Sequence, residues 1–315
     1  MNTASIVSVL MPVYNMADVV SKSINSILNQ TYSNFEFLIL DDGSTDNTWD
    51  ILSTHKDCRI SLHRFEIKKG RPEARNFLLK KATGEYVVWI DSDDFALPQL
   101  IETKLKQFKI HPQVIGIGNS AIIKLDENYY TKTLVSNTSL LKAQILFKSP
   151  FVFSSFMHKN IRNIYFDTNL NRSEDMNFIF DLFKHGQVIN ISDNLLLVNY
   201  GLSENHHQIF IDSLPYIKLY TQKVLPTDAQ FPMDNFIVLL REPKTMTHQN
   251  IHESIFAFKQ ILPNLKLTYP AIYNEIKAIY TYQVLKCSWV VSPVFLKYLR
   301  WANPFHVFQL YLTKY

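Results

Sequence analysis

The first hundred residues alternate between short apolar runs and amphipathic stretches, and this alternation restricts the fold more than any other feature. Apolar runs with the length of buried strands occur at 6–11, 35–40, 60–65 and 86–90. Stretches with apolar residues at helical spacing lie between them, at 18–28, 44–54 and 72–81. Strands that alternate with helices predict βαβ units and a largely parallel sheet, so we expect an α/β fold.

Acidic residues follow two of the expected strands. Asp41 and Asp42 come after the run at 35–40, and Asp91, Asp93 and Asp94 come after the run at 86–90. In a parallel sheet, ligands bind beyond the carboxyl ends of the strands, which is where these carboxylates should lie. Carboxylates one residue apart on a turn can converge on a hard cation such as Mg²⁺ or Mn²⁺, which keeps positions open for substrate phosphates. The structural alternatives are a solvated acidic turn at 91–94 and an ordinary Asp-Gly turn at 41–43.

The pattern loosens after Pro98. We expect a strand at 114–123, a helix at 174–184 and a strand at 195–200. After about Phe210 the sequence looks helical and rich in aromatic residues. The sequence therefore predicts an α/β domain over residues 1–210 and a mostly helical C-terminal region over residues 211–315.

Composition narrows the function classes. The 315 residues carry a formal net charge of only +4, whereas nucleic-acid binding needs a clustered basic face. The two cysteines, Cys58 and Cys287, lack metal-type spacing and are typical of reduced thiols in the cytoplasm. We see neither a signal-peptide pattern at the N-terminus nor an apolar run of about 18 residues. We therefore expect a cytoplasmic protein that does not bind nucleic acid.

Six motifs resemble those of family 2 glycosyltransferases in order and spacing. They are the segments at 7–15, 26–32, 41–46, 74–76, 84–86 and 91–94. The resemblance is strong over about residues 6–98 and weaker to about 205. It implies a GT-A fold, which is Rossmann-like with a mainly parallel central sheet flanked by helices. It also implies inverting transfer of a sugar from a nucleotide sugar, a UDP-sugar above all, to a glycan or lipid-linked glycan in cell-surface polysaccharide synthesis.

The resemblance assigns nucleotide-binding roles to five residues. Pro12 and Tyr14 match positions that line the base pocket, and Asp42 matches the residue that binds the uracil ring. Arg71 and Arg75 lie in the segment that often supplies a basic contact to the nucleotide.

A divalent metal, Mn²⁺ or Mg²⁺, is the implied cofactor. Asp91 and Asp93 match the family's D-x-D pair. Asp93 is the expected metal ligand, and Asp91 is expected at the ribose or in the metal shell. Some related enzymes place a histidine near the metal or the diphosphate after the helix that bears the base. His206 is our candidate, with His207 as the alternative, although adjacent loop histidines usually point apart.

The resemblance also implies a general base in an E-D pair later in the chain. Glu174 and Asp175 form such a pair, and Asp175 is the candidate base. An acceptor hydroxyl is a poor nucleophile until its proton leaves, and a carboxylate within hydrogen-bond reach can take that proton. The alternative is structural, with Ser173 as an N-cap and two acidic residues in the first turn of a helix.

The C-terminal region has no acidic residue after Glu275. Five basic residues there, interleaved with aromatic ones, are Lys277, Lys286, Lys297, Arg300 and Lys314. The interleaved aromatic residues include Tyr280, Tyr282, Trp289, Phe295, Tyr298 and Trp301. Such residues suit peripheral docking on the anionic inner face of the cell membrane. The alternative is a helical subdomain that packs on the core or on a second subunit of a homo-oligomer.

Two other functions are compatible with this kind of fold. A nucleotidyltransferase would need a glycine-rich phosphate loop after the first strand, where this chain has Tyr14-Asn15-Met16 and only 7 glycines in all. A non-catalytic membrane-associated scaffold would not need the carboxylates at Asp42, Asp91, Asp93 and Asp175. The sequence therefore favours the glycosyltransferase.

Overall fold

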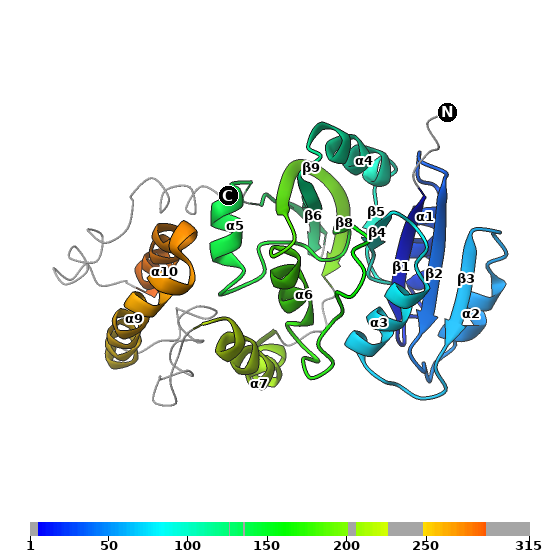
Figure 1. Ribbon diagram of the computed structural model, residues 1–315. Helices are drawn as coiled ribbons and strands as arrows, with labels where there is room; N and C mark the ends of the chain where they lie inside the picture. The colour runs from blue at the N-terminus through cyan, green and yellow to red at the C-terminus, as the bar shows by residue number, and fades with distance from the viewer. Residues whose placement is uncertain (1–5, 126, 135, 201–205, 226–247, 288–315) are drawn as a thin grey trace. The chain divides into compact units, whose positions relative to one another are not determined.

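A computed structural model describes residues 6–125, 127–134, 136–200, 206–225 and 248–287. The chain divides into two compact units (Figure 1). The first comprises residues 1–134 and 151–204, and the second comprises residues 135–150 and 205–315. We predicted a division after residue 210. The compact units divide after residue 204 instead, and residues 135–150 belong to the second unit.

Four parallel strands form one half of the sheet in the first unit, in the order β3-β2-β1-β4. They are β1 (Val7–Val13), β2 (Phe35–Asp41), β3 (Ile60–Arg64) and β4 (Tyr86–Trp89). Val13 pairs with Asp41, and Asp41 pairs with Arg64, so three of these strands end side by side. The predicted strands are confirmed, and the acidic residues that follow β2 and β4 lie beyond the carboxyl ends of the strands.

The other half of the sheet is mixed. Its strands are β5 (Phe95–Ala96), β6 (Val114–Leu125), β8 (Met157–Lys159) and β9 (Gln187–Tyr200). The order β4-β8-β6-β9-β5 joins antiparallel neighbours except at β6 and β9, which run parallel. A further strand, β7 (Asn128–Lys132), pairs antiparallel with β6. The chain therefore forms an α/β fold whose parallel part comes first in the sequence.

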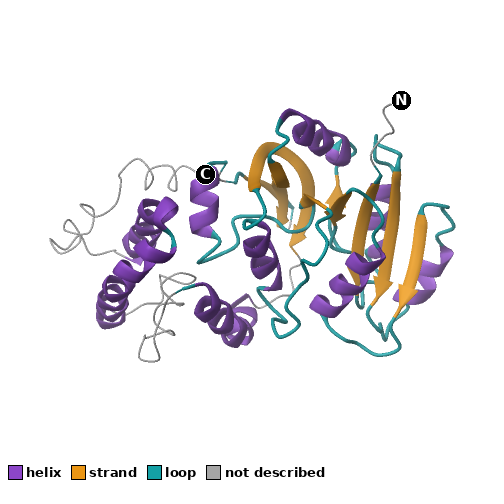
Figure 2. Ribbon diagram, in the orientation of Figure 1, coloured by secondary structure: helices purple, strands orange, loops and turns teal. Residues whose placement is uncertain are grey.

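Helices lie on both faces of the parallel strands (Figure 2). They are α1 (Val20–Leu28), α2 (Thr48–Thr54), α3 (Arg71–Lys81) and α4 (Leu100–Ile110). The side chains of Val7, Val9, Met11 and Val13 pack in one core with α1, α2 and α4. Alternate residues of a strand face opposite sides, so this core takes every second residue of β1.

The opposite side of β4 faces an aromatic cluster that reaches α6 (Glu174–Leu182). Trp89 contacts Phe153, Phe166 and Phe178, and its indole N–H donates to Nε2 of His158 over 3.1 Å. Nδ1 of His158 lies 2.8 Å from the carbonyl of Lys159, so the ring is a neutral imidazole with its proton on Nδ1. Burial lowers the pKa of His158 to about 4.

The described part of the second unit is helical. Its helices are α5 (Thr138–Gln144), α7 (His206–Val224), α9 (His248–Thr268) and α10 (Tyr273–Cys287), with a short 3₁₀ turn, η2 (Pro270–Ile272), before α10. The Tyr220 hydroxyl donates to the carbonyl of Ile145 over 2.6 Å. Tyr280 is buried and stacks on Phe258, with 3.7 Å between the ring centroids. Tyr280 is therefore part of the interior of this unit.

The membrane-docking residues predicted beyond Cys287 lie outside the described residues, and so do the side chains of Tyr282 and Lys286. None of the helices in the described ranges is long and apolar enough to cross a membrane.

Candidate functional site

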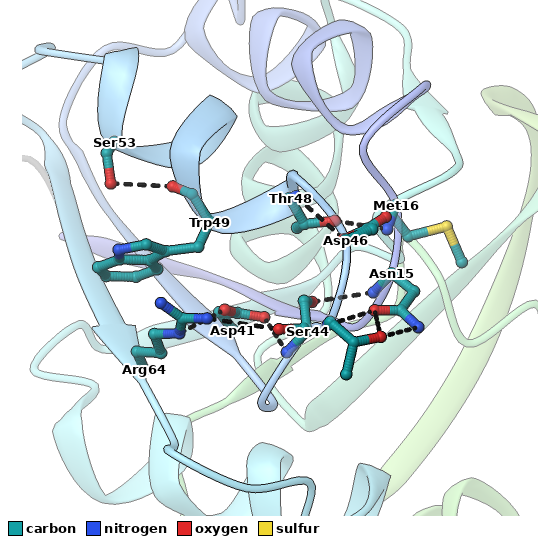
Figure 3. Close-up of polar contacts among 10 residues, drawn as sticks. Asn15, Met16, Asp41, Ser44, Asp46, Thr48, Trp49, Ser53 and Arg64 are labelled. Atoms are coloured by element: carbon teal, nitrogen blue, oxygen red, sulfur yellow. Dashed lines mark hydrogen bonds and ion pairs between the residues drawn. The ribbon is translucent and has the colours of Figure 1, made fainter.

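The loops that follow β1 and β2 are joined by hydrogen bonds between side chains and backbone (Figure 3). The Asn15 N–H donates to the Ser44 hydroxyl over 2.9 Å, and the Thr45 N–H donates to Oδ1 of Asn15 over 2.9 Å. The Met16 N–H donates to the Thr48 hydroxyl over 2.8 Å. Asn15 has a φ of 52°, a left-handed conformation that asparagine tolerates better than most residues. The loops after two neighbouring strands therefore form one rigid edge.

These contacts also shorten a predicted helix. The sequence indicated a helix over 44–54, but α2 begins at Thr48. Ser44 and Thr45 bond the loop after β1 instead, and Asp46 accepts from the Ala17 and Thr48 N–H groups. Polar side chains that bond nearby backbone compete with helix formation, which explains the later start.

Asp41 and Asp42 are both buried but have different partners. Asp41 accepts from the Ser44 N–H over 3.0 Å and forms an ion pair with Arg64, at 3.1 Å from Nε. Arg64 in turn lies over the Trp49 ring, 5.0 Å from its centroid (Figure 3). Asp41 is thus committed to the protein's own structure.

Asp42 holds the backbone of the segment before α3. Its two carboxylate oxygens accept one N–H each, from Lys69 over 2.7 Å and from Gly70 over 2.9 Å. Each carboxylate oxygen has a second lone pair, so each can accept a further hydrogen bond. The neighbouring Gly43 has a φ of 70°, and a Cβ there would lie 2.6 Å from the backbone of Ile67. Asp42 therefore combines a fixed position with remaining acceptor capacity.

Pro12 and Tyr14, which we predicted to line a base pocket, lie at this same edge. Pro12 pairs with Leu40 near the end of β1, and Tyr14 directly follows the strand. The Lys68 ammonium lies 3.7 Å from the centroid of the Tyr14 ring. We did not predict Lys68 as a candidate from the sequence. Its position in the basic segment 68–71, directly before a predicted helix, could have indicated a contact to an anionic ligand.

Arg75 connects the end of β4 to the start of α6. Its guanidinium is only 2% exposed and lies 2.8 Å from Oε1 of Glu174 and 3.4 Å from Oδ1 of Asp91. The Phe153 ring covers it, with 4.5 Å between the guanidinium and the ring centroid. The nucleotide contact expected of Arg75 stays a prediction, but its described contacts are all internal.

Arg71 lies one helical turn before Arg75 and is 56% exposed. Burial lowers the pKa of Arg71, but the carboxylates of Glu174, Asp91, Asp175 and Asp93 outweigh that effect and raise it. The Arg71 guanidinium lies 3.7 Å from Oε1 of Glu174. The predicted D-x-D pair and the predicted base therefore lie within the electrostatic reach of one accessible cation.

The E-D pair begins α6, and its two members differ in burial. Glu174 is 2% exposed, and burial raises its pKa; Arg75 lowers the pKa and Asp175 raises it further. Asp175 is half-buried, so this residue reaches the solvent. Ser173 precedes the helix in a left-handed conformation, with a φ of 63°, and its side chain makes no capping bond. The structural alternative thus holds in part: Ser173 is the N-cap residue and both acids lie in the first turn, but the Ser173 side chain does not cap the helix.

The D-x-D turn offers two accessible carboxylates. Asp91 and Asp93 are half-buried, whereas Asp94 is buried. Within the described ranges, no three Asp, Glu, His or Cys side chains are grouped closely enough to hold a metal ion. Mg²⁺ and similar ions are usually held by one or two carboxylates together with substrate phosphates, so this donor set fits a metal that binds with a nucleotide.

The histidine predicted to complete the metal site cannot be placed with it. His206 and His207 begin α7 in the second unit, and their side chains are outside the described part of the structure. The role of His206 as a ligand stays a prediction.

Residues 8–176 match the family model for glycosyl transferase family 2. An *Escherichia coli* relative, the UDP-Glc:alpha-D-GlcNAc-diphosphoundecaprenol beta-1,3-glucosyltransferase WfaP, is 41% identical over 119 residues, which are 38% of this chain and 47% of the relative. An uncharacterized glycosyltransferase of *Haemophilus influenzae* is 38% identical over 125 residues, which are 39% of this chain and 50% of the relative. The matches thus span about half the length of these curated relatives.

Solved glycosyltransferases share the fold. *Staphylococcus aureus* TarS 1-349 in complex with UDP-GlcNAc superposes with a TM-score of 0.62 at 18% identity, over 88% of this chain and 86% of that one. Mannosyltransferase PcManGT from *Pyrobaculum calidifontis*, in complex with GDP-Man and Mn²⁺, gives a TM-score of 0.57 at 17% identity, over 92% and 89% of the chains. The expected GT-A fold is confirmed. With more than half of its residues matched by the family model, the chain belongs to glycosyl transferase family 2.

Proposed function

We propose that this enzyme transfers a sugar from a UDP-sugar to a hydroxyl group of a lipid-linked glycan, with inversion at the anomeric carbon. The main support is the position of Arg71, which is close enough to Asp91, Asp93 and Asp175 for all three carboxylates to raise its pKa. Nucleotide, metal and base functions need such proximity, because they act on atoms only a few bonds apart in one substrate.

The nucleotide would bind along the edge formed by the loops after β1 and β2. Asp42 is held by two backbone N–H groups and keeps a lone pair on each oxygen, so it can accept the N3–H of uracil. The Tyr14 ring offers a stacking surface for the base, and Lys68 lies over that ring. Arg71 is exposed enough to meet the diphosphate. The UDP-Glc specificity in the name of the *E. coli* relative supports UDP as the nucleotide.

The metal would be held by Asp93, with Asp91 in its shell or at the ribose. When bound, a divalent cation neutralises charge on the departing diphosphate. Asp91 itself lies 3.4 Å from the buried Arg75, which fixes the direction of its carboxylate. The Mn²⁺ in the complex of the mannosyltransferase PcManGT supports a metal of this kind.

Asp175 would act as the general base. Its carboxylate accepts the proton of the acceptor hydroxyl as that oxygen attacks the anomeric carbon. The bond between the anomeric carbon and the diphosphate oxygen breaks, and its electron pair leaves with UDP. One displacement from the face opposite the leaving group inverts the configuration, and no covalent enzyme intermediate is required.

A lipid-linked acceptor would place the enzyme at the inner face of the cell membrane. The *E. coli* relative is named for a diphosphoundecaprenol-linked acceptor. The sequence after Glu275 contains basic and aromatic residues but no acidic ones, which suits contact with anionic headgroups.

The test is UDP release from UDP-sugars with Mn²⁺ and a lipid-diphosphate-linked sugar. Asp93→Ala should lose metal-dependent UDP binding. Asp175→Asn should bind UDP normally while kcat falls by about 10²–10⁴-fold, the usual contribution of a general base. The control is Asp57→Asn, because Asp57 pairs only with the nearby Arg59 outside this site. A wild-type protein that releases no UDP, or an Asp175→Asn variant with normal kcat, would contradict the proposal.

A further inference from the structure

Two buried serine hydroxyls bond the backbone of the D-x-D turn. The Ser23 hydroxyl, on α1, donates to the carbonyl of Asp94 over 2.5 Å and lies 3.1 Å from the carbonyl of Asp91. The Ser154 hydroxyl accepts from the Asp91 N–H over 3.0 Å. Both serines are buried. The turn that carries Asp91 and Asp93 is therefore fixed by residues about 70 and 60 positions away in the chain.

The backbone that carries Ser154 is itself fixed. Ser155 has a φ of 78°, its N–H donates to the carbonyl of Trp89 over 2.6 Å, and its hydroxyl donates to Oδ1 of Asn119 over 2.8 Å. Its carbonyl accepts from the ammonium group of Lys104, which is fully buried and also donates to Ile117. A left-handed residue other than glycine and a buried lysine are both costly, and such features persist where the surroundings over-determine them.

We infer that Ser23 and Ser154 are positioning residues for the metal–nucleotide complex. This inference rests on the proposed function. Both side chains are buried, and each hydroxyl bonds the backbone of the turn rather than a carboxylate proposed as a ligand. A site of this kind needs its ligands held within about 0.5 Å, and bonds to the backbone on either side of Asp93 supply that constraint. Losing a hydroxyl should therefore loosen the carboxylates without removing any ligand.

The experiment measures UDP binding by calorimetry with and without Mn²⁺. Ser23→Ala and Ser154→Ala should each weaken the Mn²⁺-dependent part of UDP affinity about threefold to tenfold, the usual effect of one hydrogen bond. UDP affinity without metal should change less than this, because Asp42 and Tyr14 lie on other loops. Ser23→Cys keeps a weaker donor on a larger atom, so it should give an intermediate loss.

Ser8→Ala is the matched control. Ser8 is also fully buried, and its hydroxyl donates to Glu36 over 2.5 Å and accepts from the Gly84 N–H over 2.8 Å, near the amino end of β1. It should lose stability while keeping the Mn²⁺ effect. Wild-type Mn²⁺ dependence in the Ser23 and Ser154 variants, or an equal loss in Ser8→Ala, would overturn this inference alone. If the UDP affinity of the wild-type protein were the same with and without Mn²⁺, both the proposed metal role and this inference would be overturned.

Discussion

Replacing Arg75 with methionine should destabilise the first unit substantially. The change leaves Glu174 buried, 2% exposed, without the guanidinium that lies 2.8 Å away. Removing one partner of a buried ion pair costs about 3–5 kcal/mol, because the other charge remains without water or a counter-ion. Arg71 can compensate in part from 3.7 Å, so we expect the lower end, about 3 kcal/mol. For a unit of this size the melting temperature should fall by about 6–12 °C.

The pH dependence of this loss has a definite sign. The pKa of Glu174 is raised in the folded protein, and removal of Arg75, which lowers that pKa, should raise it further. A carboxyl group with a raised folded pKa contributes stability at low pH, and this contribution is lost as pH rises from about 4.5 through the folded value. The penalty of Arg75→Met should therefore be larger at pH 8 than at pH 5, where more of Glu174 is protonated.

Urea unfolding at both pH values measures these effects, with fluorescence and circular dichroism followed in parallel. The double variant Arg75→Met/Glu174→Gln should recover part of the loss, because it removes the uncompensated charge. Arg59→Met is the control. Arg59 pairs with Asp57 and lies over Phe35, but both side chains of the pair reach solvent, so Arg59→Met should cost less than Arg75→Met. A loss below about 1 kcal/mol for Arg75→Met, or one that does not change with pH, would refute the reasoning.

Three further predictions concern single residues. The pKa of His158 is about 4 in the folded protein, against 6.5 for an ordinary histidine. The free energy of unfolding should therefore fall by about 3 kcal/mol as the pH drops from 6.5 to 4. In urea titrations, the stability advantage of wild type over His158→Gln should shrink over the same pH range. Gly43→Ala should lower the free energy of unfolding by at least about 1–3 kcal/mol, because its Cβ would lie 2.6 Å from the Ile67 backbone at a φ of 70°; thermal unfolding checks this. Asp42→Asn should weaken UDP binding at least about tenfold in calorimetry, because the new amide NH₂ would face the backbone N–H of Lys69 or Gly70. The control variant Asp57→Asn should bind UDP normally.

The parallel half of the sheet could be predicted from the sequence because its signals are local. The apolar runs of β1, β2, β3 and β4 are bounded by turn residues, and each appears within a few residues of the expected bounds. The short strand β8 could not be predicted, because three residues carry no periodicity of their own. Its place between β4 and β6 depends on contacts across the whole sheet.

The site was predictable to the level of individual motifs but not of their contacts. The roles proposed for Asp42, Asp91 and Asp175 come from their motifs. The contact between Arg75 and Glu174, in contrast, joins residues 99 positions apart in the chain. The helical spacing of Arg71 and Arg75 predicts that they share a face of α3, but not that one is buried and the other exposed. Burial of that kind depends on the Phe153 ring, which reaches Arg75 from a distant part of the fold.

The interleaved order of the two units limits how this enzyme can be dissected. Residues 135–150 belong with the helices that follow residue 204, although residues 151–204 return to the sheet. Leu140, Leu141 and Ile145 are fully buried, and the Tyr220 hydroxyl bonds the Ile145 carbonyl. A fragment truncated after residue 204 would keep this apolar segment without its helical partners and would be prone to aggregate. Swapping the C-terminal region between relatives therefore requires exchanging the internal segment 135–150 as well, so a single junction is not enough.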